Sequence, residues 1–164
     1  MTAEQYKIIT APLSVRPRLC SMIICANRYI TYACYLLFPF LVFCEFVYDR
    51  NLCIRTLVTA GVSFAVVSLF RRIVNSPRPY EILDIKPLMI KRTKGKSFPS
   101  RHCFSIFVIA VCWLRFVPIV GILLLILGVL LALLRVVLGV HFPRDVVAGA
   151  LIGILSGIIG MYIV

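Results

Sequence analysis

Long apolar runs, separated by short clusters of charged residues, dominate this 164-residue chain. A helix needs roughly 17 to 25 mainly apolar residues to cross the hydrocarbon core of a bilayer, and Arg or Lys side chains are tolerated at its ends. Five segments satisfy this requirement: residues 28–47, 53–74, 100–116, 118–138 and 143–164. The pattern predicts an all-α fold, a polytopic bundle of about five transmembrane helices.

The N-terminal residues 1–27 differ from these runs. They contain Glu4, Pro12 and Pro17, and they lack an apolar stretch of the length found in a signal peptide. We expect an interfacial helical segment there, attached to a single membrane domain that extends over residues 1–164.

The last predicted helix carries small residues on one face. Gly149, Gly153 and Gly157 are spaced four residues apart, and small residues at this spacing let membrane helices approach closely. We therefore expect this face to pack tightly against a neighbouring helix.

Composition agrees with a membrane location. Hydrophobic residues make up 62% of the chain, against roughly 45–50% in soluble proteins. The formal net charge is +12, but the basic residues stand at the ends of apolar runs, whereas a nucleic-acid-binding protein presents a continuous basic face. The charge instead suits anionic membrane lipids or a phosphorylated substrate. The seven Cys residues lack metal-ligand spacing and are expected to be buried as small hydrophobic side chains.

One long polar connection, residues 75–99, contains four prolines and the basic run from Lys91 to Lys96. Loops of this length in small proteins are usually functional or disordered. Contact of the basic run with anionic lipid and contact with a substrate both agree with its charge, so its role stays open.

Three clusters of ionisable residues interrupt the apolar pattern, and such residues near a bilayer are functional candidates by default. No predicted span separates the first two clusters, and two spans separate the second from the third, so all three are expected on one membrane face. The clusters are Arg71 with Arg78, then Ser100-Arg101-His102, then Arg135 with His141 and Asp145.

These residue types suit phosphoryl chemistry. Arg side chains present forked donors to phosphate oxygens, and Ser100 stands at a helix start, where anions bind readily. Asp145 is close enough in sequence to orient the ring of His141, and His102 could protonate a leaving oxygen. Few carboxylates are left over, so we expect no metal ion and no cofactor.

The three clusters resemble the signature motifs of the type 2 phosphatidic acid phosphatase superfamily, usually written K-x6-R-P, P-S-G-H and S-R-x5-H-x3-D. The order and the spacings match, and three residues depart from the pattern: Arg71 for Lys, Arg101 for Gly and Leu134 for Ser. The resemblance implies a metal-independent membrane hydrolase that acts on a lipid phosphate or diphosphate.

The resemblance also implies a role for each site residue. His141 would be the nucleophile that forms a phosphohistidine, Asp145 its orienting partner and His102 the general acid. The substrate phosphate would be bound by the remaining cluster residues, which are Arg71, Arg78, Ser100, Arg101 and Arg135.

Several alternatives stay open. A catalytically silent anion- or lipid-binding membrane protein would keep the same residues, and vanadate-dependent haloperoxidases have a similar site but are generally soluble. Polyprenyl diphosphate, phosphatidylglycerol phosphate and phosphatidic acid all fit as substrates, and the oligomeric state is not predicted. The resemblance implies a bacterial cell membrane and an extracytoplasmic site, although the distribution of Lys and Arg points to the cytoplasmic face.

Overall fold

The computed structural model describes residues 2–89 and 93–163. Within these residues the secondary structure is helical, without a strand, as the apolar pattern predicts. The helices are α1 (Ala3–Ser14), α2 (Pro17–Tyr48), α3 (Arg50–Val74), α4 (Pro79–Ile82), α5 (Arg101–Phe116), α6 (Pro118–Val137) and α7 (Pro143–Ile158), which ends in a π-helical turn, Ile159–Ile163.

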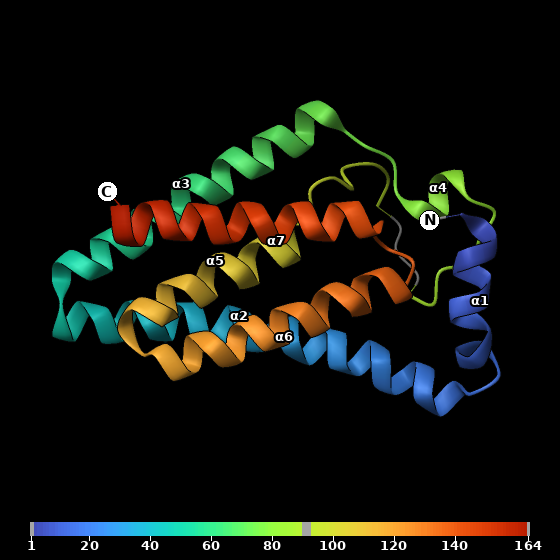
Figure 1. Ribbon diagram of the computed structural model, residues 1–164, viewed down its shortest axis with the longest axis horizontal. Helices are drawn as coiled ribbons and strands as arrows, with labels where there is room; N and C mark the ends of the chain where they lie inside the picture. The colour runs from blue at the N-terminus through green and yellow to red at the C-terminus, as the bar shows by residue number, and fades with distance from the viewer. Residues whose placement is uncertain (1, 90–92, 164) are drawn as a thin grey trace.

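Five long helices run along the longest axis of the molecule, and α1 crosses one end of them (Figure 1). Four segments are long and apolar enough to cross a bilayer: α2, α3 with its extension to Ile82, α6, and α7 with its π-helical turn. The fifth helix, α5, has only 16 residues and lies between α6 and α7. The all-α transmembrane bundle is thus confirmed, and the chain is an integral membrane protein.

The first long helix begins earlier than its apolar pattern predicts. It starts at Pro17 instead of near residue 28 and continues through Pro39. Pro17 occupies the first turn, where a missing N–H costs no helical hydrogen bond, and the exposed Arg18 and Arg28 side chains reach solvent or head groups without ending the helix. Its 32 residues span about 48 Å, so one end projects beyond the hydrocarbon core.

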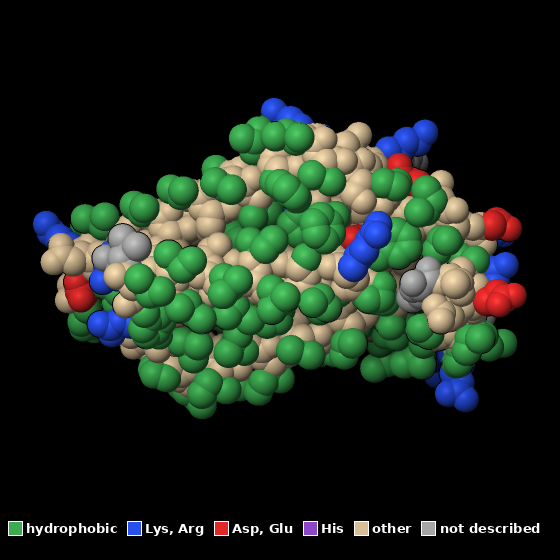
Figure 2. Space-filling view, turned by 45° about the horizontal axis from the view of Figure 1, so that its top comes forward, with side chains coloured by type: hydrophobic (Ala, Val, Ile, Leu, Met, Phe, Trp, Pro, Cys, Tyr) green, Lys and Arg blue, Asp and Glu red, His purple; other side chains and the backbone are tan. Residues whose placement is uncertain are grey.

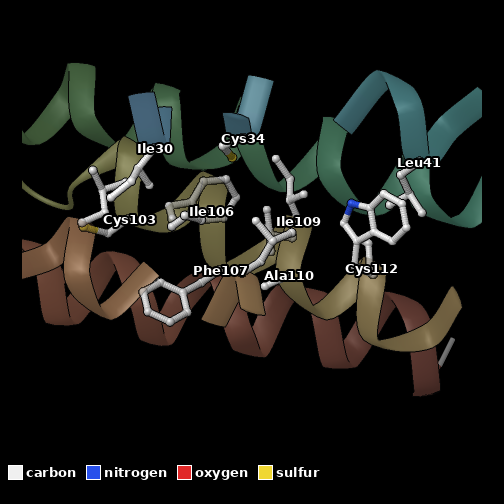
Figure 3. Packing of buried hydrophobic residues seen from close by; sticks show 14 of the residues in the cluster. Ile30, Cys34, Leu41, Cys103, Ile106, Phe107, Ile109, Ala110 and Cys112 are labelled. Atoms are coloured by element: carbon white, nitrogen blue, oxygen red, sulfur yellow. The ribbon is translucent and has the colours of Figure 1, made fainter. Parts of the chain in front are cut away.

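The core is centred on α5, which is buried on every side. Figure 3 shows Ile30, Cys34 and Leu41 of α2 on one side of this helix, and Phe107 pointing away from them. Ten consecutive or near-consecutive residues are buried, a pattern typical of a helix at the centre of a bundle. They are Cys103, Phe104, Ile106, Phe107, Val108, Ile109, Ala110, Val111, Cys112 and Trp113.

The glycine face of α7 packs directly on α5, as its spacing predicts. A Cβ atom added at Gly149 would lie 2.5 Å from the Ser100 carbonyl oxygen, and one at Gly153 would lie 2.5 Å from that of Phe104. The two helices are therefore in backbone contact, and this contact fixes the start of α7 beside the start of α5.

One face of the molecule is largely apolar between its two ends (Figure 2). On the face seen in Figure 2, hydrophobic side chains cover most of the surface, and charged side chains gather mainly toward the two ends. This distribution is what a bilayer with polar head-group layers on both sides requires.

Candidate active site

The three charged clusters meet at one end of the bundle. The end of α3, the start of α5 and the turn between α6 and α7 lie at the same end, together with α1 and α4 (Figure 1). Counting spans along the sequence predicts this arrangement.

A cavity of about 430 Å³ opens among these elements and is called the basic cavity below. Six basic side chains line it, and no carboxylate is among its described lining residues. The lining residues are Ser68, Arg71, Arg72, Arg78, Thr93, Lys94, Gly95, Lys96, Arg101, His102 and His141. So many positive charges around one cavity create a site for a multiply charged anion.

His141 sits in a tight turn between α6 and α7. Gly139 adopts φ +73°, and the Arg135 carbonyl oxygen accepts hydrogen bonds from the backbone N–H groups of Val140 (3.2 Å) and His141 (3.3 Å). This turn presents a side chain that is only 1% exposed yet lines the basic cavity.

Burial of the His141 ring lowers its pKa to about 4, which means that the ring is neutral at pH 7. The Asp145 carboxylate acts in the opposite direction, and the positive charges of Arg78 and Arg135 lower the pKa further. A neutral imidazole keeps a lone pair on one ring nitrogen, as a nucleophile requires.

Asp145 lies in the first turn of α7 and is completely buried. Its Oδ2 atom accepts hydrogen bonds from the backbone N–H of Phe142 (3.1 Å) and the hydroxyl of Ser97 (2.5 Å). The distance from Oδ2 to Nδ1 of His141 is 3.6 Å, which is longer than a direct hydrogen bond. The predicted His141 and Asp145 pair is therefore brought together, with the Ser97 hydroxyl in contact with both side chains.

Arg71 and Arg78 bind backbone carbonyl groups in the connection 75–99 and the neighbouring turn. Arg71 donates from Nη1 to the carbonyl oxygens of Ser97 (3.2 Å) and Pro99, and from Nη2 to that of Lys96. Arg78 donates from Nε to the Gly95 carbonyl (3.1 Å) and from Nη1 to the Val140 carbonyl (3.2 Å). Both side chains line the basic cavity, and both also hold its walls together.

The second cluster divides between the cavity and the core. Arg101 and His102 line the basic cavity. Ser100 is buried, and its backbone N–H donates to the Asp145 carbonyl (2.8 Å). Its hydroxyl has no hydrogen bond of standard geometry and lies beside the Cys103 thiol. Ser100 therefore joins α5 to α7 and is not among the residues that line the cavity.

The family of the chain follows from comparison with known proteins. Residues 52–164 match the PAP2 superfamily, the type 2 phosphatidic acid phosphatases. The chain belongs to the PAP2 superfamily. The resemblance drawn from the three motifs is thereby confirmed.

Two curated PAP2 relatives are about one-third identical to the chain. The chain is 32% identical over 105 residues to the bacitracin transport permease protein BcrC of Bacillus licheniformis, covering 62% of the chain and 52% of that protein. It is 33% identical over 111 residues to the putative undecaprenyl-diphosphatase YbjG of Escherichia coli, covering 66% and 54%. The matched region spans about half the length of these relatives.

Solved structures show the same fold. LpxE from Aquifex aeolicus is 28% identical, with a TM-score of 0.74 over 97% of this chain and 93% of that one. A PAP2-type phosphatidylglycerolphosphate phosphatase from Bacillus subtilis is 23% identical, with a TM-score of 0.72 over 96% and 83%.

Two of the three residues that depart from the PAP2 pattern make specific contacts in the structure. Arg71, where the motif has Lys, uses both terminal nitrogens on the loop backbone. Arg101, where the motif has Gly, is exposed and lies over the ring of Phe64, 5.8 Å from its centroid. Leu134, where the motif has Ser, is buried in the core, and nothing in the structure shows a replacement for the missing hydroxyl.

Arg135 lies deeper than a cavity-lining residue in this PAP2 protein. Its side chain is 2% exposed, its Nη2 atom donates to the hydroxyl of Thr31 on α2 (3.5 Å), and its Nε atom has no partner. Arg135 therefore acts on the basic cavity through its positive charge, and its N–H donors are not among the described groups that line the cavity.

Sequence reasoning missed Ser97 of this PAP2 site and left the role of the basic run open. The Ser97 hydroxyl oxygen lies within hydrogen-bond distance of both Asp145 (2.5 Å) and His141 (3.3 Å). Ser97 nevertheless lies just outside the motif residues, and no spacing signals that its hydroxyl points inward. Arg72, Lys94 and Lys96 line the basic cavity, and Lys94 and Lys96 place part of the basic run there. Lys91 and Arg92 of that run lie outside the described residues.

The acidic side chains near this PAP2 site are engaged with the protein itself. Glu81 accepts hydrogen bonds from the backbone N–H groups of Arg78 (2.7 Å) and Gly95 (2.9 Å). Across the described residues, no three His, Cys, Asp or Glu side chains cluster in a way that could hold a metal ion.

Proposed function

We propose that the protein is a membrane phosphatase that hydrolyses a lipid phosphate or diphosphate through a phosphohistidine and without a metal ion. The observation that carries this proposal is the basic cavity, where six basic side chains surround two histidines. Phosphoryl transfer depends mainly on positioning and on stabilising charge, and these side chains supply both. The name of one relative, the putative undecaprenyl-diphosphatase YbjG, supports the same reaction class.

An apolar path beside the cavity supports a lipid substrate. Arg101 and His102 also line a second hollow of about 160 Å³. That hollow shares Tyr35, Phe64 and Ser105 with a third, more apolar one of about 290 Å³ between α2, α3 and α5. A phosphate in the basic cavity could therefore extend a hydrocarbon chain toward the bilayer without burying polar groups against lipid.

The proposed reaction has two steps. Nε2 of His141 attacks the terminal phosphorus, and its bond to the leaving oxygen breaks; this oxygen belongs to the lipid alcohol of a monophosphate or to the lipid monophosphate released from a diphosphate. His102 gives the leaving oxygen a proton. Water then attacks the phosphohistidine and passes a proton to His102, which releases inorganic phosphate and restores His141. Asp145 keeps the His141 ring oriented throughout, while Arg78 and Arg101 stabilise the charge on phosphorus.

The test is phosphate release in detergent with excess chelator, using phosphatidic acid, phosphatidylglycerol phosphate and a polyprenyl diphosphate. We expect release by the unsubstituted chain, inhibition by vanadate, and loss of release in His141→Ala and His102→Ala. If His141→Ala and the unsubstituted chain give the same background rate, the protein is instead an anion- or lipid-binding protein. The panel also identifies the preferred lipid.

We further propose that residues 1–164 form a single membrane domain in a bacterial cell membrane, with the basic cavity on the extracytoplasmic face. Labelling a Lys94→Cys variant in intact cells with a membrane-impermeant thiol reagent tests this, because Lys94 is exposed. The unsubstituted chain controls for the native cysteines. Labelling only after the cells are broken would place the cavity in the cytoplasm.

A further inference from the structure

Through its hydroxyl, Ser97 contacts both of the residues that the proposed mechanism needs most, His141 and Asp145. Its hydroxyl oxygen lies 2.5 Å from Oδ2 of Asp145 and 3.3 Å from Nδ1 of His141, whereas Oδ2 and Nδ1 are 3.6 Å apart. We propose that Ser97 is a positioning residue that joins the Asp145 carboxylate to the His141 ring, and that Arg71 holds the backbone that carries it. This inference rests on the proposed function.

The donors and acceptors fit only one direction. A carboxylate can only accept, so the Ser97 hydroxyl donates its one proton to Asp145. The lone pair left on the hydroxyl oxygen then accepts from Nδ1–H of His141. Nε2 remains unprotonated, and it is the nitrogen that the proposed attack on phosphorus requires.

The backbone around Ser97 is held from several directions. Ser97 is fully buried, and its N–H donates to the Ser76 carbonyl (2.8 Å). Arg71 donates to three carbonyl groups, those of Lys96, Ser97 and Pro99. A planar guanidinium can present fixed donors to several acceptors at once, whereas an ammonium is a compact point charge.

This arrangement changes the role expected of Arg71. The motif resemblance implies a phosphate ligand, but the terminal nitrogens of this side chain already bind the loop. Arg71 therefore acts on the reaction through Ser97, and its loss should change the rate of turnover more than substrate affinity.

The decisive measurement is the protonation of the His141 ring, which needs no turnover. The chain has only two histidines, so ¹⁵N-histidine NMR of the full chain in detergent shows two rings, and His102→Ala assigns them. We expect His141 to carry its proton on Nδ1 at pH 7. Ser97→Ala should give a mixture of Nδ1–H and Nε2–H forms, because the acceptor for Nδ1–H is gone.

Turnover provides the second readout. Ser97→Ala should lower kcat on the order of 10-fold to 100-fold, the size expected for losing a hydrogen bond to a charged group, with little change in KM. Ser63→Ala is the matched control, since the Ser63 hydroxyl donates to backbone carbonyls of its own helix, α3, and Ser63 is not among the described residues that line the basic cavity. Unchanged ring signals and kcat in Ser97→Ala would overturn the proposal.

Arg71→Lys tests the second half and covers the case in which Ser97→Ala does not fold. We expect the same loss of the Nδ1–H form and a lower kcat, with KM within about twofold, a change worth less than 1 kcal/mol. A raised KM with unchanged His141 signals would show that Arg71 binds phosphate and would refute its positioning role. If the unsubstituted chain releases no phosphate, the proposed function fails, while the ring measurement still decides the role of Ser97.

Discussion

Gly149→Ala should damage both the packing of the bundle and the chemistry of the site. The added Cβ atom would lie 2.5 Å from the Ser100 carbonyl oxygen, where ordinary contact begins near 3.4 Å. The start of α7 must then move away from α5 by about 0.9 Å, the difference between these two distances. Asp145 moves with it, and its 2.5 Å hydrogen bond with Ser97 is stretched beyond normal length.

The expected magnitudes follow from this displacement. Overpacking of a close helix contact costs about 1 to 3 kcal/mol, partly offset by about 1 kcal/mol gained when Ala replaces Gly within a helix. A misplacement near 1 Å at reacting groups can lower kcat about 100-fold. We therefore expect a small loss of thermal stability in detergent and a large loss of kcat for phosphate release.

Gly121→Ala separates the two effects. Its Cβ would also lie 2.5 Å from a backbone atom of α5, the nitrogen of Leu114, but at the opposite end of the bundle. This control should lose stability while keeping kcat. Equal kcat values for Gly149→Ala and Gly121→Ala would refute the link between helix packing and the Asp145 position.

Three further predictions concern the turns and loops at the end of the bundle that holds the basic cavity. Because burial lowers the pKa of His141 to about 4, kcat/KM should not fall near pH 6.5 through protonation of this ring. Between pH 6.5 and pH 4 the His141 ring takes up a proton in the unfolded chain but not in the folded chain, so the free energy of unfolding should fall by about 3 kcal/mol over this range. Denaturation at several pH values measures this loss. Gly139→Ala should destabilise the His141 turn, because φ is +73° and the new Cβ overlaps the Tyr6 hydroxyl. Adding Tyr6→Phe should recover only a small part of the thermal stability, because the ring carbon Cζ of residue 6 would still lie 2.8 Å from the new Cβ. Glu81→Ala should raise KM roughly tenfold by freeing the N–H of Gly95, and an unchanged KM would show that this bond does not shape the cavity.

Much of the fold is readable in the chain because its signals are local. Apolar runs bounded by Pro118 and Pro143 define α6 and α7 closely. The start of α2 was predicted too late because Arg28 resembles a helix end, whereas a long helix can carry exposed Arg side chains beyond the hydrocarbon core.

The site is only partly readable from the sequence. The sequence predicts His141, Asp145 and His102 at one end of the bundle, because two predicted spans separate the second cluster from the third and return the chain to the same membrane face. The motif spacings do not reveal that Ser97 contacts both His141 and Asp145, since these contacts depend on how residues 96–99 pack against Arg71 near the end of α3. They also do not reveal that the Arg71 guanidinium donates to backbone carbonyls of the loop, because those contacts form only in the tertiary structure.

The central position of α5 has a consequence for how the protein enters its membrane. This helix is about 24 Å long, shorter than the roughly 30 Å hydrocarbon core, and it is flanked by Arg101 and Arg115. Its main packing partners, α6 and α7, follow it in the chain and are synthesised later. Stable insertion of α5 should therefore depend on the α6–α7 hairpin, so the packing step that buries α5 also assembles His102 with His141.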